Sequence, residues 1–385
     1  MSHLERSIDI LADLIAYPTV SSDSNLAMID DLAQRLADAG AVVDVYRDEA
    51  GQKANLYATL GPARAGGVLL AGHTDVVPVT DQDWASDPFR MMRDGGKLFG
   101  RGSCDMKGFI AACVALAPDL AGQARRRPLH FAFTHDEEVG CLGAQALAGQ
   151  LATREDTPAM AIIGEPTQMR LIEGHKGCCE YSTHFVGREG HGSLPDQGVN
   201  AVEFAVRYVA RLLELREALR NRAPRGSPFD PPRTTINIGA LHGGVAHNVI
   251  PGKARVDWEM RPVQDSDADF VRDDLAGYVA QVLLPQMQAV WPEAMIDTQV
   301  IGEVAGLLAM DENAARDLVK ALTGANGTQV VSFGTEAGIF QSLGMSALVC
   351  GPGSIAQAHK PDEYLEVSQL AQCVQMLERL GRKLN

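Results

Sequence analysis

The first 175 residues alternate between apolar positions at helical spacing and short apolar runs typical of buried strands. Residues 4–15 and 26–36 keep the helical spacing, and a stretch of small residues over 107–119 predicts a further helix. The runs that predict strands are 41–46, 55–60, 67–72, 129–134 and 160–164. Because these runs are largely apolar at successive positions, we expect an α/β fold with a mixed sheet that is buried on both faces.

The pattern changes after about residue 177. A strand at 179–186 alternates polar and apolar residues, and residues 199–218 predict a long amphipathic helix. Strands at 234–240 and 254–260 and a helix at 267–288 complete a compact α+β unit with a one-sided sheet. The α/β pattern then resumes, with helices at 311–323, 336–343 and 364–382 and strands at 329–333 and 346–350. We therefore predict one domain from 1–177 and 288–385, and a second domain inserted at 178–287.

Composition excludes several classes of protein. The net charge of −15 argues against a nucleic-acid partner, which normally meets a basic face. No stretch approaches the roughly 20 apolar residues of a membrane span, and the first helix carries Glu5, Asp9 and Asp13, unlike a signal peptide. The seven cysteines form no C-x-x-C pair. We expect reduced, mostly buried thiols in a cytoplasmic protein without a membrane or nucleic-acid partner.

Three consecutive acids follow the predicted strand 129–134, in the stretch "FAFTHDEEVG". Carboxylates that are this close repel one another, and a divalent cation converts that repulsion into shared attraction. Such a site needs further ligands at the ends of other strands, where open α/β sheets place their sites. The candidates near such ends are His73, Asp75, Asp105, Glu165 and His359. Two histidines with several carboxylates suit zinc or a similar borderline cation.

The motifs "AGHTDVVP", "GRGSCDMKG", "HDEEVG", "GEPT" and "AHKPDEY" resemble those of the dinuclear zinc amidohydrolases. That family includes aminoacylases, zinc carboxypeptidases, succinyl-diaminopimelate desuccinylase and acetylornithine deacetylase. The resemblance covers essentially the whole chain and implies a zinc-peptidase-like catalytic domain with an inserted α+β dimerisation (lid) domain. The stretches "GHKGCCEY", "FGTEAG" and "GPGSIAQAHKPDEYLE" are most similar to the acetylornithine deacetylase branch.

The resemblance also implies a role for each ligand candidate. One metal ion would be bound by His73, Asp105 and Glu165, and the other by Asp105, Glu138 and His359. The expected ions are two Zn²⁺ per chain, with Co²⁺ or Mn²⁺ as alternatives. Asp75 would accept a hydrogen bond from the far nitrogen of His73 and fix its tautomer. Glu137 would remove a proton from the attacking water and return it to the departing amine, while Asp136 would be a solvated loop acid.

The inserted segment and the C-terminal part supply the residues expected to bind substrate. His191, in "GREGHGSLPDQGVN", resembles a family histidine that helps bind the oxyanion and in dimeric members reaches the partner's site. Asn248 and Arg261 occupy positions that grip the substrate carboxylate in relatives. Glu336 is placed either to contact a substrate ammonium group or to cap the helix 336–343.

These implications define the expected function. The chain would act as a homodimer on a small N-acyl amino acid, releasing acetate from N²-acetyl-L-ornithine in arginine biosynthesis. Succinyl-diaminopimelate desuccinylase, a broader N-acyl-amino-acid aminoacylase, a dipeptidase and an inactive metal-binding scaffold are the alternatives. The desuccinylase and the aminoacylase share every expected metal ligand, so the ligands do not decide between them.

Overall fold

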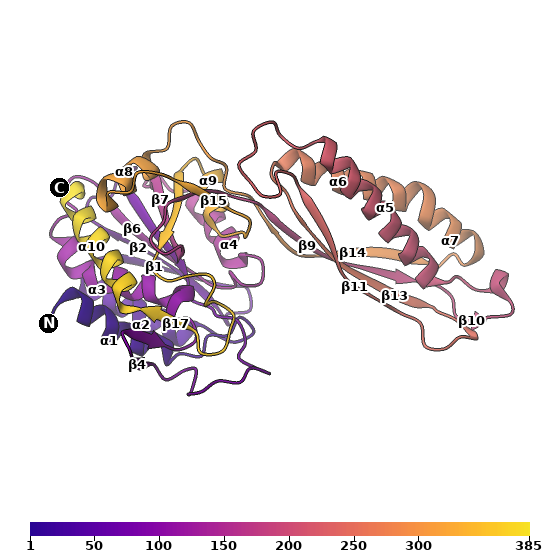
Figure 1. The fold of residues 1–385 in the computed structure, drawn as a ribbon, viewed down its shortest axis with the longest axis horizontal. Coiled ribbons are helices and arrows are strands. Elements are labelled where there is room, and N and C mark those ends of the chain that lie inside the picture. The colour runs from indigo at the N-terminus through magenta and orange to yellow at the C-terminus, as the bar shows by residue number, and fades with distance from the viewer. The chain divides into compact units, whose positions relative to one another are not determined.

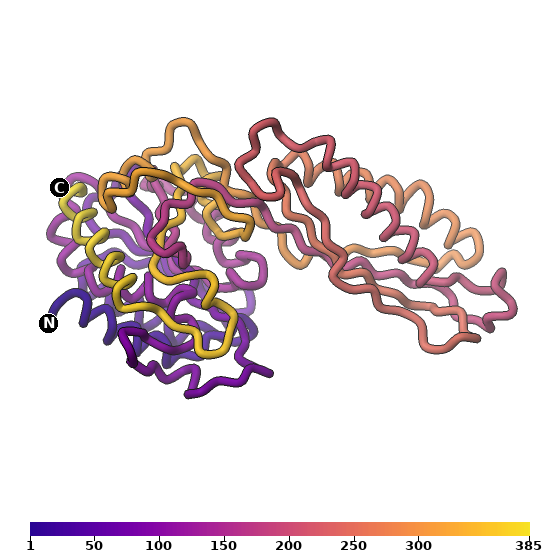
Figure 2. Tube along the Cα trace, viewed as in Figure 1, coloured from indigo at the N-terminus to yellow at the C-terminus, as the bar shows by residue number.

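The computed structural model describes residues 1–385, which form two compact units (Figure 1). The first unit contains Met1–Gly174, Leu307–Val330 and Thr335–Asn385, and the second contains His175–Gly306 and Val331–Gly334. Figure 2 shows both chain termini in the first unit. None of the helices combines the length and the apolar character that crossing a membrane requires.

The first unit is built on an eight-stranded mixed sheet. Its strands, in order across the sheet, are β1 (Val42–Arg47), β2 (Ala54–Leu60), β6 (Leu129–Thr134), β3 (Val68–His73), β7 (Met160–Pro166), β16 (Ser346–Gly351), β8 (Ile172–His175) and β15 (Gln329–Val331). Strands β6, β3, β7 and β16 run parallel, so their carboxyl ends meet at one edge of the sheet. Every residue of β2, β3, β6 and β7 is buried, which confirms the predicted α/β sheet.

Helices cover both faces of this sheet. The main core includes residues of α1 (His3–Ile15), α2 (Leu26–Asp38), α3 (Gly108–Ala121), α8 (Ala314–Thr323) and α10 (Val367–Leu384). Leu56 and Ala58 of β2 join that core. Asn55, one position away, points to the other face because side chains alternate along a strand, and its Nδ2 donates to the carbonyl of Gly143 in α4 (Leu142–Leu151). Helix α9 (Ala337–Ser342) contacts α4.

A small three-stranded sheet completes the first unit. Its strands are β17 (Tyr364–Glu366), β5 (Lys97–Phe99) and β4 (Met92–Asp94). The sequence pattern did not predict β4 and β5, which are three residues each and too short to show a period.

The second unit has two layers, an antiparallel sheet and a layer of helices. Its antiparallel sheet has the order β11 (Thr235–Gly243), β13 (Lys253–Arg261), β9 (Cys178–Val186) and β14 (Met295–Val304). The predicted insertion 178–287 ends before β14, although β14 pairs with β9 along its length. Helix α5 (Ala201–Asn221) and helix α6 (Asp265–Tyr278) pack on the sheet. The helix predicted at 267–288 consists of α6, a π-helical turn at Val279–Leu283 and α7 (Leu284–Val290).

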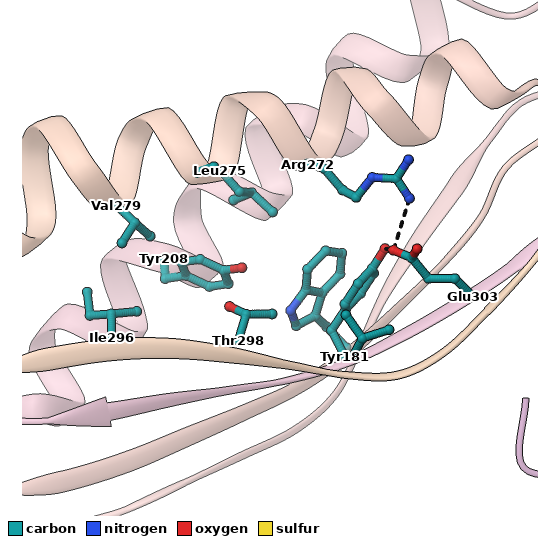
Figure 3. A pocket seen from close by; sticks show the side chains of 11 residues that line it. Tyr181, Tyr208, Arg272, Leu275, Val279, Ile296, Thr298 and Glu303 are labelled. Carbon is teal, nitrogen blue, oxygen red and sulfur yellow. Dashed lines mark hydrogen bonds and ion pairs between the residues drawn. The ribbon is translucent and has the colours of Figure 1, made fainter.

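One cavity of the second unit lies between its helices and its sheet. A cavity of about 250 Å³ lies between α6 and the sheet, and Tyr181, Trp258 and Leu275 are among the residues that line it (Figure 3). Arg272 and Glu303 form an ion pair beside it, with Nη1 and Oε1 2.9 Å apart. The two charged side chains at this cavity are therefore already paired with each other.

Candidate metal centre

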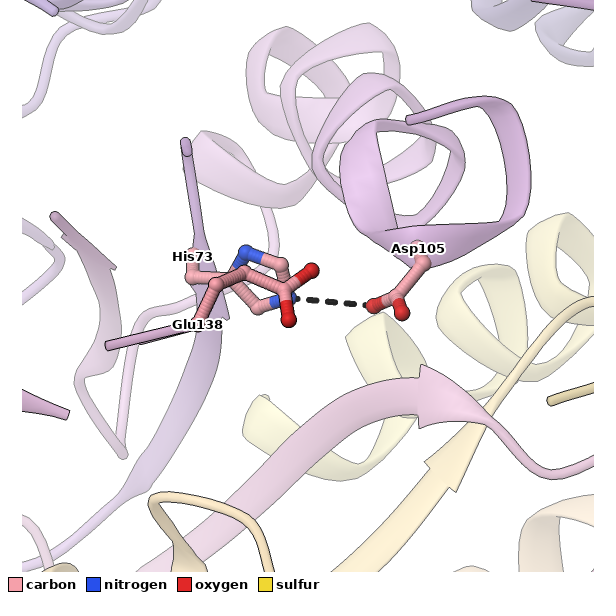
Figure 4. Close-up of side chains that lie close together, drawn as sticks. All are labelled: His73, Asp105 and Glu138. Carbon is pink, nitrogen blue, oxygen red and sulfur yellow. Dashed lines mark hydrogen bonds and ion pairs between the residues drawn. The ribbon is translucent and has the colours of Figure 1, made fainter. Parts of the chain in front are cut away.

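His73 occupies the last position of β3, at the edge where the parallel strands end. Its ring is fully buried. Nδ1 lies 2.9 Å from the backbone carbonyl of Asp75, which can only accept, so Nδ1 carries the proton. Nε2 lies 3.1 Å from Oδ1 of Asp105 (Figure 4). The unprotonated Nε2 of a neutral ring would therefore face a carboxylate oxygen, an arrangement that requires a proton or a cation between the two atoms.

The carboxylate of Asp75 does not accept the hydrogen bond from His73 that the sequence predicted. The hydrogen bond that orients His73 ends on the backbone carbonyl of Asp75, whereas the carboxylate oxygen Oδ1 lies 3.7 Å from Nδ1. The carboxylate instead accepts the backbone N–H groups of Glu137 and Glu138, at 3.0 and 3.3 Å, and the hydroxyl of Ser21 at 2.7 Å. Asp75 therefore fixes the turn that presents the two glutamates.

Asp105 lies between the two histidines. Its Oδ1 faces His73, and its Oδ2 lies 3.4 Å from Nε2 of His359. The same His359 nitrogen lies 3.1 Å from Oε2 of Glu138. Burial opposes ionisation of Asp105, but the two imidazoles outweigh it and lower its pKa strongly. The carboxylates of Asp105 and Glu138 raise the pKa of His359 to about 10.

The backbone that presents Asp105 needs a glycine. Gly102 has a φ of +80°, in the left-handed region, and a Cβ at this position would lie 2.8 Å from Cγ1 of Val76. The chain then bends at Asp105 and Met106, whose φ and ψ angles are not helical, before α3 begins. The glycine thus allows the loop to bring Asp105 close to the end of β3.

Glu137 and Glu165 complete the cluster. Possible ligand atoms of His73, Asp105 and Glu138 all lie within 4.8 Å of one another, and the same holds for His73, Glu137 and Glu165. Burial is the main cause that raises the pKa of Glu137 to about 8 and that of Glu165 well above its ordinary range. The thiol of Cys141 donates to Oε1 of Glu137 at 3.4 Å, a contact that no sequence motif indicated.

The charges of this cluster fit a divalent cation. Four carboxyl groups face two imidazoles, and burial, together with mutual repulsion, holds three of the four carboxyl pKa values above the ordinary range. Oε1 of Glu165 is buried, accepts no hydrogen bond and lies 3.8 Å from Nε2 of His73. Imidazole and carboxylate groups are ligands of zinc and related metals. The residues therefore suit the metal ions that the sequence motifs implied.

Asp136 is not the solvated acid that the sequence analysis expected. It is buried, and its carboxylate forms an ion pair with Lys53. Lys53 also donates to the backbone carbonyl of Ser21. Because Ser21 contacts Asp75 in turn, this ion pair supports the same turn that presents the glutamates.

Glu336 is buried directly before α9. Its Oε2 accepts the hydroxyl of Thr134 at 2.8 Å, its Oε1 has no hydrogen-bond partner, and the side chain makes no capping bond to the helix. Burial raises the pKa of Glu336 to about 7. The carboxyl group thus lies beside the end of β6 and does not serve as a hydrogen-bonding cap.

The other three predicted residues lie in the second unit. His191 is exposed in β10 (Gly190–His191), which pairs with β12 (Val249–Ile250), and the carbonyl of Asn248 accepts the N–H of Gly192 at 2.8 Å. His191 and Asn248 therefore lie in adjoining loops near the start of β13. Arg261 ends β13 and pairs with Glu259, with Nη2 and Oε2 2.7 Å apart. β13 is an extended strand of nine residues, with these loops near its start and Arg261 at its end.

The fold and the cluster together define a metal-dependent hydrolase of the metallopeptidase type. Residues 69–383 match the sequence model of peptidase family M20/M25/M40, and the chain belongs to this family. It is 37% identical over 372 residues to an acetylornithine deacetylase from Klebsiella pneumoniae (strain 342), covering 95% of this chain and 94% of that protein.

Solved structures share the fold at low sequence identity. An M20 family metallo-carboxypeptidase from Sulfolobus solfataricus has a TM-score of 0.76 at 15% identity, covering 98% of this chain and 99% of that chain. A dinuclear metal binding peptidase of the M20 family from Bacillus subtilis has a TM-score of 0.64 at 15% identity, covering 99% and 98%. At this identity the likeness concerns the fold alone.

Proposed function

We propose that the protein is an acetylornithine deacetylase, which hydrolyses N²-acetyl-L-ornithine to L-ornithine and acetate. The observation that carries the proposal is the 37% identity to a relative of that name over 95% of the chain. The buried cluster of histidines and carboxylates supports it, because amide hydrolysis needs an activated water and a stabilised oxyanion.

The proposed cofactor is a pair of divalent ions, with Zn²⁺ as the first choice. His73, Asp105 and Glu165 would hold one ion, and Asp105, Glu138 and His359 would hold the other. Bound ions of this kind lower the pKa of water and polarise a carbonyl oxygen. The contacts of Asp105 support its bridging role, since each of its oxygens faces a different histidine.

Glu137 is the proposed proton carrier. Its carboxyl group is buried beside the cluster, and a pKa of about 8 without bound metal shows how strongly the surroundings favour the protonated form. One of its oxygens would accept the proton of the attacking water and later deliver it to the departing amine. The backbone hydrogen bond to Asp75 holds Glu137 in place for this transfer.

His191 is proposed to act on the site of a partner subunit. At about 3.3 Å per residue, the length of β13 puts roughly 26 Å between the loops of His191 and the position of Arg261. A substrate as small as acetylornithine does not span that distance, so the two side chains of one chain do not contact the same molecule. This separation supports a homodimer in which His191 and Asn248 of one chain serve the site of the other chain, and Arg261 binds the α-carboxylate in the site of its own chain.

The proposed dimer contact is the edge strand β14, which follows the predicted segment 178–287 and pairs with β9 of that segment. Met295, Val300 and Ile301 are each more than 40% exposed. An edge strand with exposed apolar side chains offers free backbone groups and apolar area to a second copy of the chain.

Glu336 is the proposed partner of the ammonium group of the substrate. Its unpartnered Oε1 would accept a hydrogen bond from an ammonium, which would also hold the carboxyl group in its ionised form. Because the side chain is fully buried, this contact requires α9 to move when substrate binds.

The test is a substrate comparison with the metal-loaded protein. We expect kcat/KM to be highest for N²-acetyl-L-ornithine among that compound, N-succinyl-diaminopimelate, N-acetylmethionine and a free dipeptide. A higher kcat/KM for the succinyl compound, the methionine derivative or the dipeptide would replace the proposal by desuccinylase, aminoacylase or dipeptidase activity respectively.

A further inference from the structure

A buried ion pair lies behind the loop that carries Asp105. The side chains of Arg101 and Glu363 are each about 1% exposed, with Nη1 and Oε2 2.8 Å apart. Glu363 also accepts three backbone N–H groups of the loop: those of Cys104 and Asp105 on Oε1, at 3.0 and 3.2 Å, and that of Gly102 on Oε2, at 3.0 Å. One carboxylate therefore fixes most of the turn that positions Asp105.

Arg101 reaches the loop that carries His359. Its Nη1 donates to the carbonyl of Lys360 at 3.3 Å, and its Nη2 donates to Oε1 of Gln82 at 2.6 Å. Nε2 of Gln82 donates in turn to the carbonyl of His359 at 3.0 Å. His359 has a φ of +62°, a left-handed conformation that a residue with a Cβ adopts only when its surroundings hold it.

We infer that Glu363 and Arg101 are positioning residues that set Asp105 against His359. The pair joins two loops that lie more than 250 residues apart along the chain, and each loop carries a ligand that must keep a fixed distance to the other. Removing a buried ion pair often costs little stability when its space is refilled, so an ion pair with this many backbone contacts serves geometry as well as folding. The inference rests on the metal centre proposed above.

The test measures metal binding and not turnover. Chelator-stripped protein is titrated with Co²⁺, and calorimetry and the visible absorption of the bound ions are recorded for the wild type, Glu363→Gln and Gln82→Ala. Since Asp105 would contact both ions, Glu363→Gln should weaken both by about 10- to 100-fold and change the Co²⁺ spectrum. Gln82→Ala loses the hydrogen bonds of Gln82 to the His359 carbonyl, to Arg101 and to Trp84 but keeps Glu363 on the Asp105 loop. It should therefore weaken one ion by roughly three- to tenfold.

A matched control separates positioning from general destabilisation. Arg222 pairs with the fully buried Asp267 in the second unit, with Nε and Oδ1 2.8 Å apart. Arg222→Gln should lower the Tm while leaving Co²⁺ affinity and spectrum as in the wild type.

The possible outcomes separate failure of the positioning role of Glu363 and Arg101 from failure of the proposed metal centre. Wild-type protein that binds fewer than two Co²⁺ per chain would overturn the metal centre itself. Two ions in the wild type, with unchanged affinity and spectrum in Glu363→Gln, would overturn the positioning role alone. If Glu363→Gln does not fold, Gln82→Ala decides: unchanged Co²⁺ binding in that variant overturns the inference, and selective loss of one ion supports it.

Discussion

Replacing Glu336 by glutamine should change how the stability of the metal-free protein depends on pH. Burial raises the pKa of this carboxyl group from an ordinary 4.5 to about 7. A group whose pKa is raised in the folded state contributes its full stability below the unfolded pKa and loses it as the pH rises through the folded pKa. The wild type should therefore lose stability from Glu336 between about pH 4.5 and pH 7.

The size of this loss follows from the two pKa values. One pKa unit is worth about 1.4 kcal/mol, so a rise from 4.5 to about 7 corresponds to about 3 kcal/mol above pH 7. A glutamine does not ionise, and its amide oxygen can still accept the hydroxyl of Thr134. The free energy of unfolding of Glu336→Gln, relative to the wild type, should therefore rise by about 3 kcal/mol from pH 4.5 to pH 8.

Urea unfolding of chelator-treated protein, followed by circular dichroism at several pH values, measures this difference. If the glutamine amide destabilises the fold by an amount that does not depend on pH, the difference in unfolding free energy shifts equally at every pH. Its slope against pH is then unchanged. A difference that stays flat from pH 4.5 to pH 8 would show that Glu336 ionises normally and that its burial does not hold a proton. A kinetic comparison tests the ammonium contact: Glu336→Gln should lower kcat/KM for acetylornithine by roughly ten- to a hundredfold and leave N-acetylmethionine nearly unchanged.

Three further predictions concern the proposed centre and dimer. Purified protein should carry up to two divalent ions per chain by metal analysis, and full activity in protein without metal would refute the mechanism. Glu137→Gln should keep its metal but lose about 10²- to 10⁴-fold in kcat, because the amide does not accept the water proton; near-normal kcat would reassign Glu137 to a structural role. Mixing inactive His191→Ala and Glu137→Gln chains should restore about a quarter of wild-type activity if His191 crosses a dimer interface, whereas no recovery from a reassembled mixture would place His191 outside the partner's site.

Sequence reasoning located the residues of the cluster because of one geometric rule. His73 ends β3, Glu165 lies in β7 and the glutamates follow β6, and the carboxyl ends of parallel strands share an edge. Chemically distinctive residues at successive strand ends therefore predict that their side chains lie close together. The pattern failed at β14, whose residues are mostly exposed and so show no clear apolar period.

The supports of the cluster left no comparable signal in the sequence. Asp75 and Glu363 both act by accepting backbone N–H groups, and a backbone N–H is present at almost every position, so the sequence does not mark which one is bound. Glu363 lies 258 residues from Asp105 along the chain. A metal ligand can be recognised from its residue type and its sequence motif. A residue that positions a ligand can be recognised only from its place in the fold. For this reason the metal centre could be proposed from motifs, while the hydrogen bonds that set its geometry required the fold.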